Sequence, residues 1–318
     1  MAARYSVANG NWNATSTWAT SAGGTAGASV PIAGDRAILY NYTVTMTADA
    51  IVGSLHYYQG TLEGDGNKLT IKGDSGHGGL LQIDNNVIDD IDITIDSGRD
   101  GTIDVLGSSG SVNNLVIDSS GYTISLAAAA TISEDLTITA GTLDTDSGSN
   151  HALTVTGDVS VTGTLTGNAS AISMKSIDIA SGGTYTATSG TTTITGVGGS
   201  DYPFKNHTSG NFVHSSGTVT FSSSAYKNFD AGGDPFYNFI STGTSEFRSQ
   251  RAFTVANDFT ISSSGSGYFR PNGNAFTVTG DVAINSGGEI RCTDEADTFG
   301  SLTIASGGTY SATSGTTT

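Results

Sequence analysis

The sequence predicts an all-β protein folded as a parallel β-helix, or β-solenoid, with an N-terminal cap and a long internal duplication. Three observations predict it: a segment that recurs at a long offset, short alternating strands between turns rich in glycine, serine and aspartate, and a strand spacing too long for hairpins. No stretch shows the sustained i, i+3, i+4, i+7 apolar pattern of a helix. Only LAAAATISEDL, at 126–136, leaves room for a short helical turn.

The duplicated segment spans 131–193 and returns at 254–318. Both copies contain a TVTGDV strand followed by a closely similar IASGGTY segment. Thr254 lies 123 residues after its equivalent (254 − 131), and Ser301 lies 125 residues after Ser176 (301 − 176), so the second copy carries two extra residues between the matched blocks. Similarity kept over such a length indicates stacked units, each of which contacts only its neighbours.

Residues 1–53 differ from the rest of the chain. They hold both tryptophans, Trp12 and Trp18, and a Val30-Pro31 step before the strand-like AILYNYTVTM. The end of a stack of coils otherwise exposes an open apolar face and unpaired strand edges. We therefore expect this segment to cap the stack and also to serve as a docking segment.

Short strands between polar turns begin at about Ser54. Residues 91–96 alternate isoleucine with aspartate or threonine, which places the isoleucines on one side of a strand. Comparable apolar positions recur at Leu136, Val159 and Ile177, at steps of 23 and 18 residues. Sandwiches built from hairpins place turns about every 8–12 residues, so the spacing favours coils of about 18–23 residues that stack in parallel.

An aromatic segment, residues 194–253, completes the long repeat unit. Large aromatic side chains are usually buried, so we expect its phenylalanines to fill a wider coil interior. The alternative is an outward platform on which sugar rings stack. The phenylalanines concerned are Phe204, Phe212, Phe221, Phe229, Phe236 and Phe239.

The second copy is shorter than the first. Thr318 corresponds to Thr193, after which the first copy continues into the aromatic segment. We therefore expect the natural protein to extend beyond Thr318. The sequence divides into a cap or docking segment over 1–53, β-solenoid coils over 54–130, a long repeat unit over 131–253, and an incomplete second copy over 254–318.

Charge and hydropathy exclude several partners. The 318 residues include 12 basic and 29 acidic side chains, a formal net charge of −17 that repels nucleic acid and anionic lipid. No stretch approaches the ~20 apolar residues of a membrane span. The N-terminus lacks the apolar core of a signal peptide. We expect synthesis in the cytoplasm without a signal peptide, no nucleic-acid binding and no membrane insertion.

The densest acidic cluster lies between residues 84 and 104. Strand alternation places Asp90, Asp92 and Asp96 on one outward face, and a solvated face is the favoured interpretation. Two alternatives stay open: a Ca²⁺ site, because this ion prefers clustered carboxylate oxygens, and a carboxylate pair for glycoside hydrolysis. The members of the cluster are Asp84, Asp89, Asp90, Asp92, Asp96, Asp100 and Asp104.

The remaining candidates for chemistry are isolated. Cys292, beside Arg291 and Asp294, is interpreted as a plain strand residue. The histidines lie far apart without metal-ligand spacing, which favours surface or turn positions. We therefore predict no catalytic, cofactor-binding or metal-binding residues and no cofactor. The five histidines are His56, His77, His151, His207 and His214.

The opening segment, RYSVANGNWNATSTWATSAGGTAGASVPIAGDRAILYNYTVTM, resembles the start of tail-associated β-solenoid proteins of tailed bacteriophages. The resemblance rests on an Arg-Tyr dipeptide, two tryptophans, the GASVP segment and a Gly-Asp pair before a strand. The segment is also similar, more distantly, to G8-type domains at the head of extracellular β-helices. The later GTVTFSSSAYKNFDAGGDPFYNFISTG is similar to coils in the same phage proteins. The resemblance implies a virion fibre or tail component and carries over no catalytic residue.

These observations lead us to expect a non-enzymatic structural protein of a bacteriophage virion, either a tail fibre or a tail-attached appendage that extends toward the host surface. Expected partners are other tail or baseplate proteins, a host surface glycan and further copies of the chain, as in a trimer. Its location would be the extracellular virion particle. Two alternatives stay open: a solenoid polysaccharide depolymerase similar to tailspikes, and a bacterial surface adhesin or filament subunit.

Overall fold

The computed structural model describes residues 2–76, 78–83, 87–105, 112–196, 202–262, 267–293, 296–312 and 316–318. The fold is all-β, with 55% strand and 1% helix, and forms a parallel β-solenoid of about 12 turns. The predicted fold class is therefore confirmed. The expected place for a helical turn is wrong: 126–136 contains the strand β13 (Ala130–Ile132), and the helical turn within the described ranges is the 3-10 turn η1 (Thr15–Thr17).

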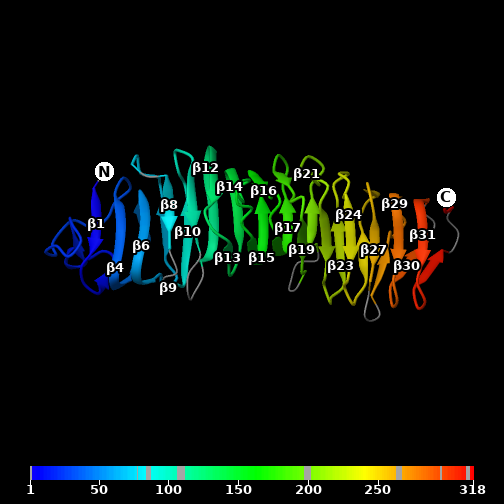
Figure 1. The fold of residues 1–318 in the computed structure, drawn as a ribbon, viewed down its shortest axis with the longest axis horizontal. Coiled ribbons are helices and arrows are strands. Elements are labelled where there is room, and N and C mark those ends of the chain that lie inside the picture. Colours follow the sequence, from blue (N-terminus) through cyan, green and yellow to red (C-terminus); the bar gives the residue numbers. More distant parts are fainter. Residues whose placement is uncertain are drawn as a thin grey trace. The chain divides into compact units, whose positions relative to one another are not determined.

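The chain divides into two compact units, Met1–Gly157 and Asp158–Thr318. In the first unit, β4, β6 and β8 lie side by side in successive coils (Figure 1). The strands of this unit are β1 (Ala3–Ser6), β2 (Gly10–Asn11), β3 (Trp18–Ala19), β4 (Arg36–Thr45), β5 (Ala50–Val52), β6 (Ser54–Glu63), β7 (Lys68–Ile71), β8 (Gly79–Gln82), β9 (Val87–Asp89), β10 (Ile91–Ile95), β11 (Gly101–Asp104), β12 (Val112–Leu126), β13, β14 (Leu136–Asp144) and the start of β15 (Leu153–Val161).

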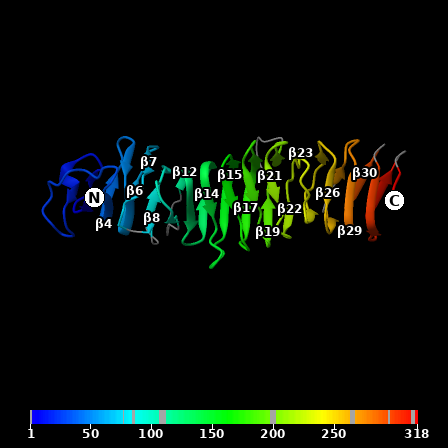
Figure 2. The same cartoon turned by 90° about the horizontal axis from the view of Figure 1, so that it is seen from above.

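The second unit repeats the same construction. Its strands β22 (Thr218–Phe221), β24 (Asn238–Ser241), β27 (Phe259–Ile261) and β29 (Phe276–Ile284) pair in parallel, one coil after another. Figure 2 labels the first and the last of these four strands. After the end of β15, its strands are β16 (Thr164–Thr166), β17 (Ile172–Ile179), β18 (Thr184–Thr186), β19 (Thr191–Ile194), β20 (Phe204–Asn206), β21 (Asn211–Val213), β22 (Thr218–Phe221), β23 (Lys227–Asp230), β24 (Asn238–Ser241), β25 (Phe247–Ser249), β26 (Phe253–Val255), β27 (Phe259–Ile261), β28 (Tyr268–Arg270), β29 (Phe276–Ile284), β30 (Glu289–Cys292), β31 (Asp297–Ile304) and β32 (Thr309–Ala312).

The N-terminal segment departs from purely parallel pairing. Strand β1 runs antiparallel to β3 and parallel to β4. Trp12 and Trp18 are buried edge to face, with ring centroids 5.1 Å apart, and the indole Nε1–H of Trp18 donates to the backbone oxygen of Trp12 at 2.8 Å. Burying both rings and satisfying the indole donor gives this segment its own small core. Its role as a cap stays a prediction.

The length of a coil varies more than the sequence spacing predicts. Paired residues lie 18 positions apart between Arg36 and Ser54, but 27 apart between Ile177 and Phe204. The longer step arises between Ile194 and Phe204, where the chain inserts residues that the preceding coil lacks. The strands on both sides of this insertion stay paired, because lengthening a connection costs little free energy.

The interior changes from aliphatic to aromatic along the chain. In the first unit, Ile91, Ile93 and Ile95 are fully buried while the alternate residues of β10 are half-buried, which confirms the predicted alternation. In the second unit, the six phenylalanines named above, from Phe204 to Phe239, are all buried, which confirms core packing over an outward platform. Rings of successive coils stack directly, as in the pair Phe229 and Phe247, with centroids 4.6 Å apart and planes 11° apart.

The duplicated sequences form equivalent strands. Three-residue β13 corresponds to β26, nine-residue β15 to β29, and eight-residue β17 to β31. The glycine of each TVTGDV strand lies where two coils approach closely, since a Cβ on Gly157 or Gly280 would lie within 2.6 Å of the coil before it. The shared glycine is therefore a packing requirement of the shared coil.

Candidate functional site

The acidic cluster is spread along several coils, and most of its carboxylates accept hydrogen bonds from a neighbouring coil. Asp90 and Asp92 accept from the side-chain amides of Asn113 and Asn114, at 2.8 and 2.9 Å. Asp100 accepts the backbone N–H of Thr123 at 2.7 Å, and Asp96 pairs with Lys72. Asp84 lies outside the described residues. Across the described parts of the chain, no three Asp, Glu, His or Cys side chains are arranged to hold a metal ion.

Two of these aspartates join acids that the sequence cluster did not contain. Glu63, Asp65, Asp89 and Asp90 line an open hollow of about 290 Å³ together with Thr45, whose hydroxyl donates to Glu63 at 2.8 Å. The hollow forms because β6 and β9 pair with Glu63 opposite Asp89. The sequence analysis did not predict this hollow. Glu63 and Asp65 lie one coil before Asp89 and Asp90, and the sequence alone does not give the length of that coil.

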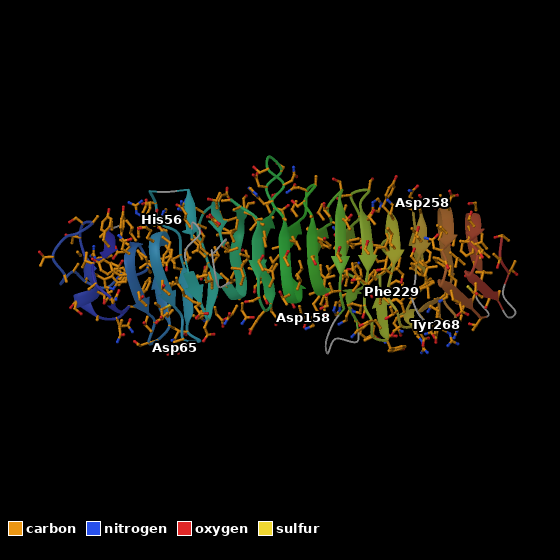
Figure 3. All side chains as sticks on the ribbon, turned by 60° about the horizontal axis from the view of Figure 1, so that its bottom comes forward. His56, Asp65, Asp158, Phe229, Asp258 and Tyr268 are labelled. Atoms are coloured by element: carbon orange, nitrogen blue, oxygen red, sulfur yellow. The ribbon has the colours of Figure 1, made fainter. Side chains whose placement is uncertain are left out.

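The histidines occupy different environments. His56 corrects the expectation of surface or turn positions: β6 buries it beside a hollow of about 460 Å³ that Gln82 and Asp104 also line. His207 pairs through Nε2 with Asp178 at 2.9 Å, and His214 accepts a backbone N–H through Nδ1. Figure 3 places His56 and Asp65 at opposite edges of the first unit. His151 is half-buried, and His77 lies outside the described residues.

Cys292 is a buried residue of β30, with 3% of its surface exposed, so its predicted place in a strand is confirmed. The pattern of β30 explains this position. Ile290 and Cys292 alternate inward while Glu289 and Arg291 alternate outward. Asp294 lies outside the described residues.

The outward side of β23, β25, β28 and β30 carries an organised group of tyrosines, glutamates and arginines. We call it the Tyr–Arg face, and Figure 3 shows one of its members, Tyr268, at the edge of the second unit opposite Asp258. Strand register sorts the side chains into two columns that run from coil to coil. One column contains Tyr226, Glu246, Tyr268 and Glu289, and the other contains Asn228, Arg248, Arg270 and Arg291.

Each of the two tyrosines contacts an arginine of the next coil. The guanidinium of Arg291 lies over the ring of Tyr268, 3.7 Å from the centroid, and that of Arg248 lies 5.0 Å from the centroid of Tyr226. Both contacts are within the range of cation–π attraction. The same triad, a tyrosine followed on the next coil by Glu-x-Arg, therefore occurs twice on this face.

Ion pairs cross-link the two columns. Arg291 donates through Nε and Nη2 to both carboxylate oxygens of Glu289, at 2.7 and 2.8 Å. Glu246 binds Arg248, and its Oε1 lies 3.9 Å from Nη1 of Arg270. Burial opposes ionisation of Glu246, but hydrogen bonds from Arg248 and Tyr268 and the two positive charges hold the pKa of Glu246 below its ordinary value.

Glu246 also affects the pKa of Tyr268, which lies opposite it on the next coil. Burial first, and then the hydrogen bond to Glu246 and its negative charge, raise the pKa of Tyr268 above its ordinary value. Tyr268 therefore stays a neutral hydrogen-bond donor. The face therefore presents fixed donors and aromatic rings, with the carboxylate of Glu246 ionised at neutral pH.

Sequence reasoning missed the Tyr–Arg face. Its signal is the repeated Glu-x-Arg of EFR and EIR, each after a coil that carries an outward tyrosine. The two arginines lie 43 residues apart (291 − 248), which spans two coils of unequal length. The alignment becomes visible only once the register of the intervening β28 is known.

Comparison of the chain with protein-family models, with curated proteins and with solved structures finds no match in any of the three. Among the helices of the described ranges, none has the length and apolar character needed to cross a bilayer.

Proposed function

We propose that the chain is a non-enzymatic structural protein of a bacteriophage virion, a tail fibre or tail-attached appendage that extends toward the host surface. The observation that carries the proposal is the duplication of whole coils, in which β13, β15 and β17 recur as β26, β29 and β31. Each added coil lengthens a parallel stack by about 4.8 Å, the spacing between neighbouring strands. Duplication of coils therefore lengthens the solenoid directly.

Packing supports a mechanical role within each unit. The inward side chains of successive coils contact one another, as Phe253 and Phe276 do, with centroids 4.7 Å apart and planes 14° apart. A stack filled in this way resists bending, because bending would separate close-packed side chains. Such stiffness suits a protein that holds a binding surface away from the particle.

The resemblance of the opening segment to phage tail proteins is the reason for proposing the virion as the location of the chain. In this account residues 1–53, with the buried pair Trp12 and Trp18, dock on other tail or baseplate proteins. The later coils then project toward a host glycan.

Immunogold labelling of phage particles tests this proposal. Antibodies raised against the second unit are applied to gradient-purified particles and to uninfected cells of the same host. The proposal predicts label on the tails and none on uninfected cells. Label on uninfected cells and none on particles would instead establish a bacterial adhesin or filament subunit.

An assay for new reducing ends, with purified chain and host surface polysaccharide, tests the other alternative. The proposal predicts no increase in reducing ends over time. A steady increase that depends on the chain would identify a depolymerase and contradict the non-enzymatic role.

A further inference from the structure

The Tyr–Arg face carries a local excess of positive charge on an acidic chain. Four of the seven arginines of the sequence lie between residues 248 and 291, although the formal net charge is −17. Within the two columns, three guanidinium groups face two carboxylates. Like charges opposite one another on paired strands lower stability. Arg248, Arg270 and Arg291 are in register on successive coils, an arrangement that stability alone does not favour.

Arg270, in the middle of the column, is the least engaged of the three. Arg248 and Arg291 each form a close ion pair with the glutamate two residues before them. Arg270 has a longer contact with Glu246, at 3.9 Å. Its Nε is buried without a hydrogen-bond partner among the described residues, while 35% of its side chain is exposed. A guanidinium group presents a planar fork of donors that matches a carboxylate. Arg270 therefore offers a ready site for a carboxylate from outside the chain.

The aromatic side chains near Arg270 indicate which kind of molecule would carry this carboxylate. Tyr226 exposes 43% of its surface two coils before Arg270 on the same face. A half-exposed tyrosine offers an apolar ring and a hydroxyl, which suits a sugar ring with one apolar side. Two coil steps span about 10 Å, which is comparable to the disaccharide repeat of an extended polysaccharide. A nucleic acid carries a phosphate on every nucleotide and is repelled by the charge of the whole chain.

We propose that the Tyr–Arg face binds a linear acidic polysaccharide, with a sugar carboxylate on Arg270 and a neighbouring sugar ring against Tyr226. The polysaccharide runs from coil to coil across β23, β25 and β28. Glu246 and Glu289 form ion pairs with the flanking Arg248 and Arg291, which keeps the net positive charge of the face small. A polysaccharide with widely spaced carboxylates should therefore bind better than one with a carboxylate on every sugar. This ligand deepens the proposed function, on which it rests for its biological setting.

Titration calorimetry of the full chain tests the proposal with three probes: hyaluronate, polygalacturonate and polysialic acid. We expect hyaluronate, with one carboxylate per disaccharide, to bind. The two polymers with a carboxylate on every sugar, neutral dextran and polyglutamate should all bind at least ten-fold more weakly than hyaluronate. Arg270→Ala should weaken binding at least about ten-fold, because a hydrogen-bonded charge is lost. Arg270→Lys should recover only part of the affinity, since it keeps the charge without the fork. Tyr226→Ala should weaken binding by a smaller factor.

Lys72→Ala is the matched control, since Lys72 is an exposed cation paired with one aspartate in the first unit. It should leave the affinity unchanged, and unchanged thermal unfolding of each variant shows that the fold is intact. The proposal is overturned if hyaluronate does not bind, if polyglutamate or the two densely charged polysaccharides bind equally well, or if Lys72→Ala weakens binding as much as Arg270→Ala. It is also overturned if Arg270→Ala changes the oligomeric state by light scattering, which would make the face an interface between copies. These outcomes leave the virion-labelling result untouched, so failure of the ligand and failure of the virion role are distinguishable.

Discussion

Asp258 accepts a hydrogen bond from the backbone N–H of Asp281 on the next coil, with 2.9 Å between Oδ1 and the nitrogen. The same corner repeats along the stack. Asn238 accepts the N–H of Asp258 at 3.3 Å, and Asp281 accepts the hydroxyl of Ser301 at 2.6 Å. In the first unit, Asn114 accepts the N–H of Asp135 at 3.1 Å. A short polar side chain at each of these positions thus accepts a hydrogen bond from the following coil, and in three of the four the donor is a backbone N–H.

The corner glycines should not tolerate a side chain. A Cβ on Gly280 would lie 2.5 Å from Oδ1 of Asp258, and one on Gly157 would lie 2.3 Å from Oδ1 of Asp135. We expect Gly157→Ala and Gly280→Ala each to lower the free energy of unfolding by about 1–3 kcal/mol, the range for overpacking. Urea denaturation measures the change. Gly98→Ala is the control, because a Cβ there meets open space. Equal stability of all three variants would show that the coils are not in this register.

The aromatic core should be sensitive to truncation. Phe229 is fully buried and lies 4.6 Å from Phe247 and 5.0 Å from Phe253, measured between ring centroids. We expect Phe229→Ala to lower the free energy of unfolding by about 3–5 kcal/mol, because it removes buried surface and leaves a cavity. Thermal unfolding followed by circular dichroism measures it. Val213→Ala, at a position that is 41% exposed, should change stability little; a similar loss in both variants would contradict the buried aromatic core.

Much of this fold is predictable because local sequence patterns determine which side chains of a coil face inward. The alternation in 91–96 predicts the inward isoleucines of β10, and the TVTGDV repeat predicts two equivalent strands. The burial of Phe204 and its neighbours follows from the size and hydrophobicity of their rings. These features depend on neighbours within one strand, so they need no knowledge of register.

Features that depend on register between coils were not predictable. The Tyr–Arg face requires Arg248 opposite Arg270 and Tyr268 opposite Glu289. The acidic hollow requires Glu63 opposite Asp89. From β4 onward, the steps between paired residues range from 18 to 27, and the sequence does not show where a coil contains additional residues. Each unknown loop length shifts every later alignment.

Glu246 should make stability depend on pH. Its pKa is lower in the folded chain than its ordinary value of 4.5, so its contribution is complete above about 4.5 and is lost as the pH falls through the depressed folded value. We expect Glu246→Gln to lower the melting temperature at pH 7 and to have a shrinking effect as the pH is lowered toward 3. Differential scanning calorimetry at intervals over this range gives the difference. A difference that grows on acidification would contradict the stabilised carboxylate.

Cys292 should be protected from thiol reagents in the folded chain. It is the one cysteine of the sequence, and only 3% of its surface is exposed. Ellman's reagent should therefore react slowly under native conditions and rapidly with one thiol per chain in guanidinium chloride, because reaction requires an exposed thiolate. Rapid reaction of the native chain would show that β30 does not bury this side chain.

The most direct test of the central claim is a cryo-EM map of phage particles at side-chain resolution. The account predicts a tail-attached density in which the stacked phenylalanine rings of the second unit are visible and residues 1–53 contact a tail or baseplate protein. A map in which the chain occurs only in free filaments, with residues 1–53 against the last coil of another copy, would contradict the virion role.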